Sequence, residues 1–405
     1  MNGSGARPAG EDAAGRVTRR QFASSASAAL SGAAGLSVSA CSQLPDPDSY
    51  EAVAAQTWRL DDMARRDGAA ANLESLAEPG RELARELVRM ATLAPSSHNT
   101  QCWKFALDDN AITIRPDLSR RCPAVDPDDH HMFVSLGCAA ENLVQAALAH
   151  GLAAEPRFDV SRDAIIVPLT PLSLLLPLSA TPTQASPLFN AIAARQCTRG
   201  DYDGQPLSNE ELRLLERAGT SSGVRLLLLT DRPAMERVLD YVVQGNIAQM
   251  ADAAFVKELK GWIRFNGKDA VRTRDGLYSG ASGNPSIPAW VGELAFGWFF
   301  TPKAENEKYT RQIRSSAGIA VFVGLAADKA NWVEVGRSYE RFALQATALG
   351  IRNAFLNQPV EVPAVRSPFA DAMGLAGQRP DLVVRFGRGP TLPRSLRRPV
   401  QAVLV

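Results

Sequence analysis

The sequence predicts an α+β fold in which a mixed sheet is flanked by long helices. Three observations lead to this prediction. Apolar residues recur at helical spacing in long segments, such as 136–147. Short, continuous apolar runs, such as 224–230 and 319–323, are typical of buried strands. One helical pattern also occurs twice, which suggests that a single unit has been duplicated along the chain.

The first part of the chain, 1–41, is expected to be an export signal outside the fold. Thr18-Arg19-Arg20-Gln21-Phe22 is a twin-arginine pattern, and the run 23–40 is weakly apolar but too polar for a stable membrane span. The run ends in Val38-Ser39-Ala40-Cys41, which resembles a lipobox. We expect twin-arginine export to a periplasmic or membrane-anchored location, with Cys41 as the candidate acylated residue. A stray Arg-Arg pair in a tail is the alternative.

The remainder divides into a tether and two copies of one unit. Residues 42–75 are rich in Pro and Asp, and we expect a linker followed by a packing helix near Trp58. The copies are predicted at 76–185 and 186–405. A Pro-rich stretch, 169–185, lacks helical period and is expected to be an extended crossover between them.

The duplicated pattern defines the predicted central helices. The segments 137–151 and 336–350 each have Gly at both ends, an apolar face and Glu at the fifth place, which is Glu141 in one and Glu340 in the other. Each is expected to be a core helix closed by a C-cap glycine. Chance similarity between two Ala-rich helices is the alternative interpretation.

One loop in the first copy carries an unusual set of polar residues. After a helical apolar stripe, the chain continues Ala94-Pro-Ser-Ser-His-Asn-Thr-Gln-Cys-Trp-Lys-Phe105, and Pro95 is expected to end the helix. Short hydroxyl and amide side chains can hydrogen-bond a planar polar ligand. A capped helix end followed by a core tryptophan is the structural alternative.

A second candidate site opens the second copy. Arg195 and Arg199 lie four residues apart, on one face of a helical turn. Guanidinium groups bind a phosphate monoester bidentately, so the pair suits such a ligand. A solvated pair at a helix end is the alternative. Beyond it, Ser208 and Glu211 form a capping box that starts a helix over 212–218.

The first loop resembles the flavin-contacting loop of the nitroreductase family of FMN enzymes. The resemblance implies that Ser96, Ser97 and Asn99 contact the flavin, with Gln101 nearby. The family usually has Pro where this chain has Cys102.

The arginine segment also resembles the opening motif of this family, R-x-S-x-R, whose arginines bind the FMN phosphate. The resemblance implies that Arg195 and Arg199 form the clamp, with Cys197 in the Ser position as a weaker donor. A basic pair near the family's C-terminus completes the phosphate site, and its candidates here are Arg397 and Arg398.

Members of the family are usually homodimers with FMN at the subunit interface. The resemblance therefore implies that the two copies imitate the dimer within one chain, which we expect to be a monomer with one FMN. The first copy has no R-x-x-x-R opening, so a second intact site is not expected.

The segment 261–306 is expected to be a lid over the flavin. It combines many aromatic residues with Gly and Pro and shows no clear period. This composition argues against disorder. A membrane-contacting surface is the lesser interpretation.

Several other function classes lack support. The formal net charge of +1 gives no support for nucleic acid as a partner. The sequence contains no G-x-G-x-x-G after a strand, no P-loop and no C-x-x-C pair. The cluster 126–131 (Asp-Pro-Asp-Asp-His-His) resembles a metal site, but a solvated turn with an N-cap aspartate is preferred. We predict no metal ligand and no residue that must act as acid or base.

These features predict an FMN-binding, nitroreductase-like oxidoreductase. It would pass electrons through FMN from NAD(P)H or another reductant to an electron-poor small molecule, such as a nitroaromatic or a quinone. The alternative is a protein that holds or sequesters FMN with little turnover, as has been proposed for the duplicated, lidded subfamily that this chain resembles.

Overall fold

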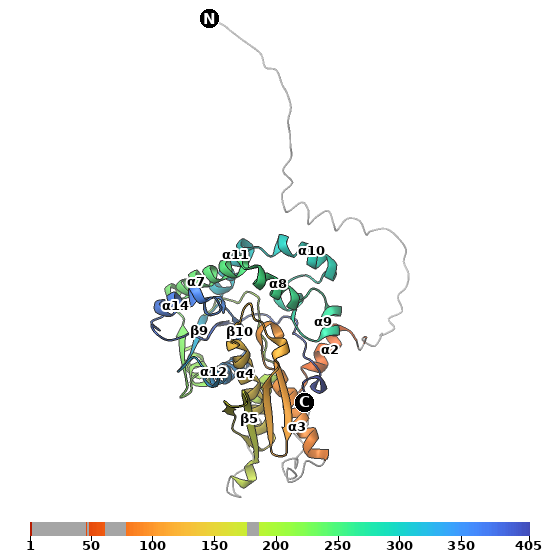
Figure 1. Ribbon diagram of the computed structural model, residues 1–405. Helices are drawn as coiled ribbons and strands as arrows, with labels where there is room; N and C mark the ends of the chain where they lie inside the picture. The colour runs from red at the N-terminus through yellow and green to blue at the C-terminus, as the bar shows by residue number, and fades with distance from the viewer. Residues whose placement is uncertain (2–45, 47, 61–77, 176–185) are drawn as a thin grey trace, which may run out of the picture. The chain divides into compact units, whose positions relative to one another are not determined.

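The computed structural model describes residues 1, 46, 48–60, 78–175 and 186–405 (Figure 1). The predicted export signal, Cys41 and much of the predicted tether lie outside the described residues. The part of the tether that is described forms α2 (Tyr50–Thr57), and Trp58 follows it as a buried C-cap.

Within the described residues the strands form two larger sheets with antiparallel pairing between neighbours, and β7 (Ile263–Arg264) and β8 (Leu277–Tyr278) form a separate parallel pair. The first sheet has the order β1-β2-β5-β3, with β4 also paired to β5; the strands are β1 (Trp103–Asp108), β2 (Ala111–Pro116), β3 (Leu152–Ala154), β4 (Arg157–Asp159) and β5 (Ala164–Pro171). The second sheet has the order β6-β9-β11-β10; the strands are β6 (Val224–Leu229), β9 (Gly318–Gly324), β10 (Arg352–Phe355) and β11 (Leu382–Gly387).

The two sheets belong to two copies of one unit. In chain order, α3-β1-β2-α4-β3-β5 matches α6-β6-β9-α12-β10-β11, and the corresponding strands occupy the same places in their sheets. The helices of the two series are α3 (Glu78–Thr92), α4 (His130–Ala149), α6 (Asn209–Gly219) and α12 (Lys329–Ala348). The α+β class and its two diverged copies are therefore confirmed. The exact domain boundaries stay a prediction.

Each sheet also receives a parallel bridge at its edge, which makes it mixed as predicted. Leu404 near the C-terminus pairs with Phe105 of β1, so the end of the second copy extends the sheet of the first. Cys197 pairs with Asn353 of β10 in the same parallel sense. The first bridge joins the second copy to the first, whereas the bridge at Cys197 lies within the second copy.

The central helices α4 and α12 cross at a pair of glycines. A Cβ atom on Gly137 would lie 2.0 Å from the carbonyl oxygen of Val333, and one on Gly336 would lie 2.0 Å from that of Val134. Only glycine allows the two backbones to approach this closely. The crossing is reciprocal, as expected for two copies related by an approximate two-fold axis.

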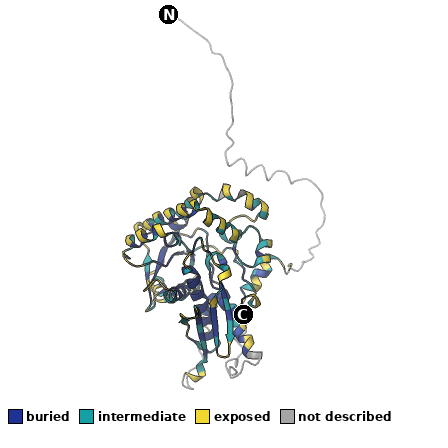
Figure 2. Cartoon of the chain, viewed as in Figure 1, coloured by how far each residue is buried: buried dark blue, intermediate teal, exposed yellow. Residues whose placement is uncertain are grey.

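The C-terminal ends of the central helices agree with the sequence, whereas α4 and α12 begin at His130 and Lys329, before the predicted starts at 137 and 336, so Gly137 and Gly336 lie inside them. Gly151 (φ 77°) and Gly350 (φ 70°) follow the helices in the left-handed conformation that favours glycine. Helix α4 is long and apolar enough to cross a membrane, but 89% of its most apolar window is buried inside the protein, which is typical of a core helix. Figure 2 shows α4 and the strands beside it largely in the buried colour.

The two copies differ mainly in one long insertion. β1 and β2 follow one another directly, whereas a helical segment separates β6 from β9. Its elements are α7 (Arg232–Ala251), α8 (Ala253–Trp262), β7 (Ile263–Arg264), α9 (Gly267–Thr273), β8 (Leu277–Tyr278), η6 (Ser279–Ser282), α10 (Ala289–Phe299) and α11 (Pro302–Arg314). In Figure 1 these helices gather at one end of the folded unit.

The insertion corrects one sequence prediction. Its first two helices, α7 and α8, are divided at Asp252, whose carboxylate caps the start of α8. The predicted lid 261–306, which lacks an obvious period, contains the helices α9 and α10. From here on, "the lid" means residues 261–306.

Short elements complete the fold. They are α5 (Pro187–Ile192), α13 (Gln358–Glu361), α14 (Pro363–Ala372), η3 (Ser97–Asn99), η4 (Leu118–Arg120), η5 (Leu172–Leu174) and η7 (Val400–Ala402). The expected crossover at 169–185 begins as the end of β5 and then η5, and its part from 176 on lies outside the described residues.

Candidate functional site

One pocket collects side chains from six separate stretches of the chain. It has an empty volume of about 620 Å³, a figure that includes open solvent at its mouth. It is lined by Trp58, Pro95, Ser96, Asn99, Arg195, Gln196, Cys197, Arg199, Leu277, Tyr278, Ala281, Ser282, Phe355, Pro393, Arg394, Ser395 and Arg397. The structure thus brings the loop of the first copy, the arginine segment of the second, the lid and the C-terminal tail to one place.

The loop after Pro95 has a strained backbone. His98, Asn99 and Gln101 have φ values of 49°, 53° and 54°, in the left-handed region that residues other than glycine rarely adopt. Ser96 supports this turn, because its Oγ accepts a hydrogen bond from the backbone N–H of Gln101 at 2.9 Å. Strain concentrated in a short loop is typical of functional sites.

Asn99 and Gln101 use their amides to hold other segments. The Asn99 Nδ2 donates to the carbonyl oxygens of Gly276 (3.0 Å) and Leu396 (3.2 Å). The Gln101 Nε2 donates to the carbonyl oxygen of Arg274 at 2.9 Å. Asn99 lines the pocket, whereas Gln101 is fully buried behind it, and Ser97 is also absent from the lining residues. These two amides therefore connect the loop to the lid.

Arg195 is a buried member of an ion pair. Its Nε lies 3.1 Å from the Glu340 carboxylate of the central helix α12, and its Nη2 donates to the carbonyl oxygen of Leu93 at 2.8 Å. Burial opposes the charge of Arg195, but the neighbouring Glu340 holds its pKa above the usual value. Burial raises the pKa of Glu340 to about 7, against the opposing effect of Arg195. Part of the positive charge at this end of the pocket is thus compensated.

Arg199 differs from Arg195 in having an uncommitted side chain. Within the described part of the chain, its guanidinium has no hydrogen-bond or ion-pair partner, although it lines the pocket. Its backbone is held firmly, since Gln312 donates to its carbonyl oxygen and the buried Arg385 donates to that of Gly200 at 2.8 Å. A fixed backbone that presents a free guanidinium is suited to an anionic ligand.

Cys197 lies between the two arginines on the pocket wall. Its Sγ is 3.8 Å from the Arg195 Nη1 and 3.9 Å from the Tyr339 hydroxyl. Its backbone forms the parallel bridge to Asn353, which fixes the segment against β10.

The C-terminal candidates differ from each other. Arg397 lines the pocket, but its guanidinium donates to the carbonyl oxygens of Thr92, Leu93 and Ala94 at the end of α3 and to the Asn99 Oδ1. Further bonds to backbone carbonyls of the tail occupy the same group, so all five of its N–H donors have acceptors. Burial and the nearby Arg195 lower the pKa of Arg397 to about 9, which leaves it charged at neutral pH. Its main contribution is to hold the loop in place.

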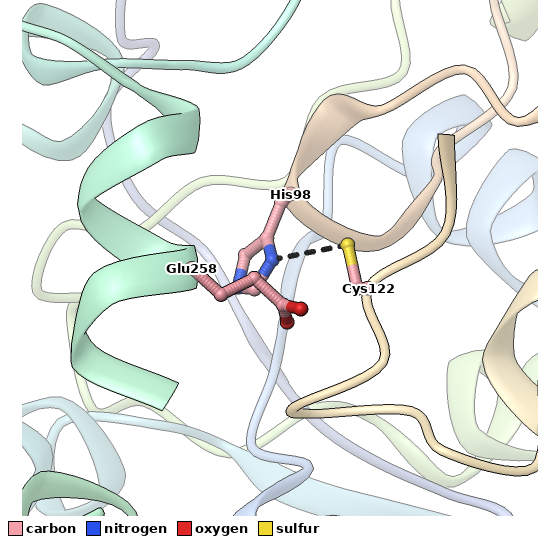
Figure 3. Close-up of side chains that lie close together, drawn as sticks. All are labelled: His98, Cys122 and Glu258. Atoms are coloured by element: carbon pink, nitrogen blue, oxygen red, sulfur yellow. Dashed lines mark hydrogen bonds between the residues drawn. The ribbon is translucent and has the colours of Figure 1, made fainter. Parts of the chain in front are cut away.

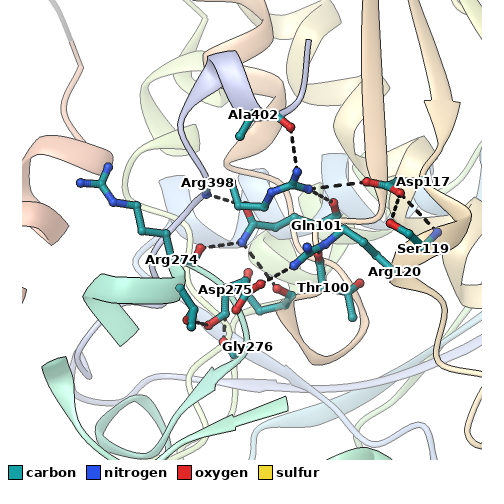
Figure 4. Close-up of polar contacts among 12 residues, drawn as sticks. Thr100, Gln101, Asp117, Ser119, Arg120, Arg274, Asp275, Gly276, Arg398 and Ala402 are labelled. Atoms are coloured by element: carbon teal, nitrogen blue, oxygen red, sulfur yellow. Dashed lines mark hydrogen bonds and ion pairs between the residues drawn. The ribbon is translucent and has the colours of Figure 1, made fainter. Parts of the chain in front are cut away.

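Arg398 lies outside the pocket. Its Nη2 donates to the carbonyl oxygen of Ala402 at 2.7 Å, and its backbone N–H donates to the Gln101 Oε1 at 2.7 Å. The side chain also lies 3.8 Å from the Asp117 carboxylate. It fastens the C-terminal tail beside the loop (Figure 4).

The lid is attached to the loop by one turn, Arg274-Asp275-Gly276. The Asp275 carboxylate pairs with Arg120 and, at 2.6 Å, with Arg264. Figure 4 shows this turn meeting Thr100, Gln101 and Arg120 of the first copy. Leu277 and Tyr278, which follow the turn, then form part of the pocket wall. The lid and the loop are therefore in direct contact beside the pocket.

Sequence reasoning missed the role of the segment around Trp58. This tryptophan lines the pocket, its Nε1 donates to the carbonyl oxygen of Ser395 at 3.0 Å, and Arg394 and Arg397 lie over its ring at 5.1 and 4.8 Å. Tyr50 of α2 contacts the lid through Tyr278, with ring centroids 4.4 Å apart. The aromatic residues of the predicted packing helix were the available signal.

The equivalent position in the other half of the molecule is built differently. Glu141, the counterpart of Glu340, lies 2.8 Å from Arg341 and 3.4 Å from Arg337, which belong to the neighbouring central helix. The arginine that pairs with this glutamate therefore comes from a core helix, and not from a segment that lines a pocket. This asymmetry agrees with the expectation of one site per chain.

The rejected metal cluster requires one correction. Asp126, His130 and His131 are 5%, 1% and 3% exposed, so the turn is buried and not solvated. The aspartate does cap a helix, because the Asp126 carboxylate accepts the backbone N–H of His131 at 3.0 Å and of Met132 at 2.9 Å. The His130 Nε2 lies 2.9 Å from the carboxylate of Asp381, the residue before β11. The cluster joins the two copies.

Similar proteins are found among curated sequences, whereas no family model matches the chain. A Mycobacterium tuberculosis protein with the provisional name NAD(P)H nitroreductase Rv3131 is 25% identical over 334 residues, which cover 80% of this chain and 92% of the relative. A second protein of that organism, with the provisional name NAD(P)H nitroreductase acg, is 23% identical over 331 residues, which cover 80% and 95%. The chain is thus similar to nitroreductase-like proteins over most of its length.

Solved structures with a similar arrangement include two nitroreductases. One is an FMN-bound nitroreductase from Bacteroides fragilis, with 15% identity, a TM-score of 0.31 and coverage of 50% of this chain and 88% of that chain. The other is the FMN-dependent nitroreductase NfnB from Mycobacterium smegmatis in complex with NADPH, with 12% identity, a TM-score of 0.33 and coverage of 50% and 87%.

Proposed function

We propose that this chain binds one FMN in the pocket and acts as a nitroreductase-like oxidoreductase. The observation that carries the proposal is the Arg199 guanidinium, which has no partner among the described residues and lines the same pocket as Ser96 and Asn99 of the strained loop. A phosphate monoester is the part of FMN that requires such a donor. Similarity to proteins provisionally named NAD(P)H nitroreductases supports the same class.

The residues of the pocket divide the work of binding. Arg199 and Arg195 would hold the phosphate, with the Cys197 thiol as a weak additional donor. Ser96 and Asn99 would lie beside the ring system, and Leu277 and Phe355 supply apolar surface. The isoalloxazine supplies the redox chemistry when it is bound, and the protein positions it and excludes water.

The visible spectrum of the purified protein tests this proposal. We expect the protein to be yellow, or to become so on incubation with FMN, with one flavin per chain after removal of excess ligand. A folded protein that remains colourless with FMN present would contradict the proposal. Addition of a reductant should bleach the bound flavin and show that it is redox-active.

A second function, FMN sequestration with little turnover, is favoured by the attachment of the lid. Arg274 and Gly276 contact the loop directly, and Asp275 pairs with Arg120, whose guanidinium donates to the Thr100 carbonyl oxygen, so the lid has no obvious freedom to admit a nicotinamide. Stopped-flow reduction of the bound flavin by NADPH separates the two functions. Rapid reduction supports the oxidoreductase, and slow reduction by NADPH with rapid reduction by dithionite supports sequestration.

We further propose that the chain is exported by the twin-arginine route as a monomer. This route carries folded proteins, so FMN could be bound before export. The pattern Thr18 to Phe22 and the candidate anchor Cys41 support the proposal. Export of a fusion of 1–41 to a reporter protein, and its loss when Arg19 and Arg20 are both replaced by Lys, tests the route.

A further inference from the structure

We propose that His98, Cys122 and Glu258 bind one Zn²⁺ and thereby clasp the lid-bearing insertion to the loop of the first copy. The three side chains come from three elements: the loop at η3, the segment before α4, and helix α8 (Figure 3). Their ligand atoms, the imidazole nitrogen, the thiol sulfur and a carboxylate oxygen, all lie within 4.8 Å of one another. The sequence offered no such spacing, because 160 residues separate His98 from Glu258 (258 − 98 = 160).

The measured separation fits the coordination geometry of zinc. Zn–S bonds of about 2.3 Å and Zn–N bonds of about 2.0–2.1 Å at a tetrahedral angle place sulfur and nitrogen about 3.6 Å apart. The His98 Nδ1 and the Cys122 Sγ are 3.5 Å apart. A metal between these two atoms would bind the Cys122 thiolate and the neutral imidazole nitrogen, and it would release the thiol proton.

Glu258 is held in position by the segment that carries Cys122. Its two carboxylate oxygens accept the backbone N–H groups of Ala124 at 2.9 Å and Val125 at 3.2 Å. These bonds fix the direction of the carboxylate and leave lone pairs on both oxygens for a cation. Backbone donors of this kind act as outer-shell partners of a metal ligand.

The strained backbone of His98 is a second, independent observation. His98 is not a glycine, yet its φ of 49° lies in the left-handed region. This conformation helps to direct the imidazole toward Cys122 and Glu258. Strained residues of this type concentrate at ligand clamps. The neighbours Val125, Phe255 and Leu259 are buried and apolar, which favours a soft thiolate–imidazole metal such as Zn²⁺ over Mg²⁺ or Ca²⁺.

The site has three protein ligands, so a water molecule would complete the tetrahedron. The metal would connect the loop that carries Ser96 and Asn99 to helix α8, which leads into the lid. Its consequence is mechanical: it strengthens the attachment already made by the turn 274–276.

Direct metal binding to the full folded chain tests this inference. Chelator-treated protein is dialysed against Zn²⁺ and its metal content is measured; Co²⁺ is then used as a spectroscopic probe, since tetrahedral Co²⁺ absorbs in the red, where oxidised flavin does not. We expect one Zn²⁺ per chain and a tetrahedral Co²⁺ spectrum with thiolate charge transfer. Both readouts are independent of FMN binding, so they can fail or succeed separately from the proposed function.

Two variants locate the site. Loss of a residue that only hydrogen-bonds to a metal ligand typically weakens metal binding about 10–100-fold. Cys122→Ser and Glu258→Gln each change a direct ligand, so each should weaken Zn²⁺ binding by at least this factor. Cys138→Ser is the matched control, because this buried thiol lies elsewhere and a hydroxyl can keep its bond to the Gly336 carbonyl oxygen. Substoichiometric Zn²⁺ in the wild type, or unchanged binding in folded Cys122→Ser and Glu258→Gln proteins, would overturn the inference.

Discussion

At the scale of single residues, Arg195 and Arg199, which the sequence predicted as a phosphate-binding pair, have different environments. Arg195 is paired with Glu340, whereas the Arg199 guanidinium has no partner within the described residues. The sequence shows that the two arginines are four residues apart. It does not show that only Arg195 has an acidic partner, because that partner, Glu340, lies far along the chain in the second predicted central helix. The same limit applies to Arg397, whose acceptors are carbonyl oxygens at the end of α3. A basic residue in a family-like position therefore need not be a free donor.

The free guanidinium leads to the first prediction, that Arg199→Ala weakens FMN far more than riboflavin. Loss of one charged partner of a desolvated phosphate should cost about 2–5 kcal/mol, whereas riboflavin has no phosphate to lose. Titration of flavin-depleted protein, followed by flavin fluorescence, measures both affinities. Arg213→Ala on the exposed face of α6 is the control for the change in net charge. Equal losses for the two ligands would remove Arg199 from the phosphate site.

The second prediction concerns Glu340 and pH. Its folded-state pKa is raised from 4.5 to about 7, so the folded protein holds this proton more tightly than the unfolded chain. The associated stability is present below about pH 4.5 and is lost as the pH rises through 7. Relative to Glu340→Gln, the wild type should lose up to about 3 kcal/mol of unfolding free energy across this window.

Urea unfolding of both proteins at several pH values measures this difference. Glu340→Gln also replaces a buried carboxyl group that lies 3.1 Å from Arg195, which has its own cost, and only the difference in how stability changes with pH is diagnostic. Parallel pH profiles for the two proteins would show that the carboxyl titrates normally in the fold.

At the scale of elements, the sequence predicted what local pattern determines. The central helices, the strands 224–230 and 382–387 and the capping box at Ser208 and Glu211 were expected and are present. The strand β1 was not anticipated, because its Trp103 was assigned to the preceding loop. The helices inside the lid were also missed, since their aromatic and glycine content hides the helical period. Long-range contacts decide both cases.

The third prediction tests the crossing of the central helices. Gly137→Ala places a methyl group where the Val333 carbonyl oxygen now lies, so the helices must separate. Overpacking of this kind typically costs about 1–3 kcal/mol or more. Gly336→Ala should have a similar effect from the reciprocal side, and chemical denaturation measures both.

Gly261→Ala provides the matched control for these substitutions. A Cβ atom on this helical glycine would meet no other atom within 4 Å, so alanine should be neutral or stabilise by about 0.5–1 kcal/mol. A Gly137→Ala protein as stable as Gly261→Ala would mean that the crossing is not tightly packed.

At the scale of the whole molecule, duplication explains why the site has parts from both copies. The first copy supplies the loop, the second supplies the arginine segment and the lid, and the C-terminal tail returns to the first sheet. The sequence revealed the two copies through their central helices. It could not show that the segment around Trp58 closes one side of the pocket, because that contact joins residues more than three hundred positions apart.

The last prediction is that the attached lid limits reduction by NADPH. Hydride transfer requires the donor carbon to approach the flavin N5 to about 3–3.5 Å, and a lid held by the turn 274–276, in which Asp275 pairs with Arg120, would keep a nicotinamide outside this range. We expect slow reduction of the intact protein by NADPH and rapid reduction by dithionite.

Asp275→Ala removes the contacts to Arg120 and Arg264 and should speed the NADPH reaction by about tenfold, equivalent to about 1.4 kcal/mol. Glu236→Ala, which removes an exposed ion pair of the same insertion, should leave the rate unchanged. Replacing 261–306 by a short Gly/Ser linker is the stronger test if FMN stays bound. Rapid reduction of the intact protein, or no gain in either variant with FMN retained, would favour an ordinary nitroreductase with an open site.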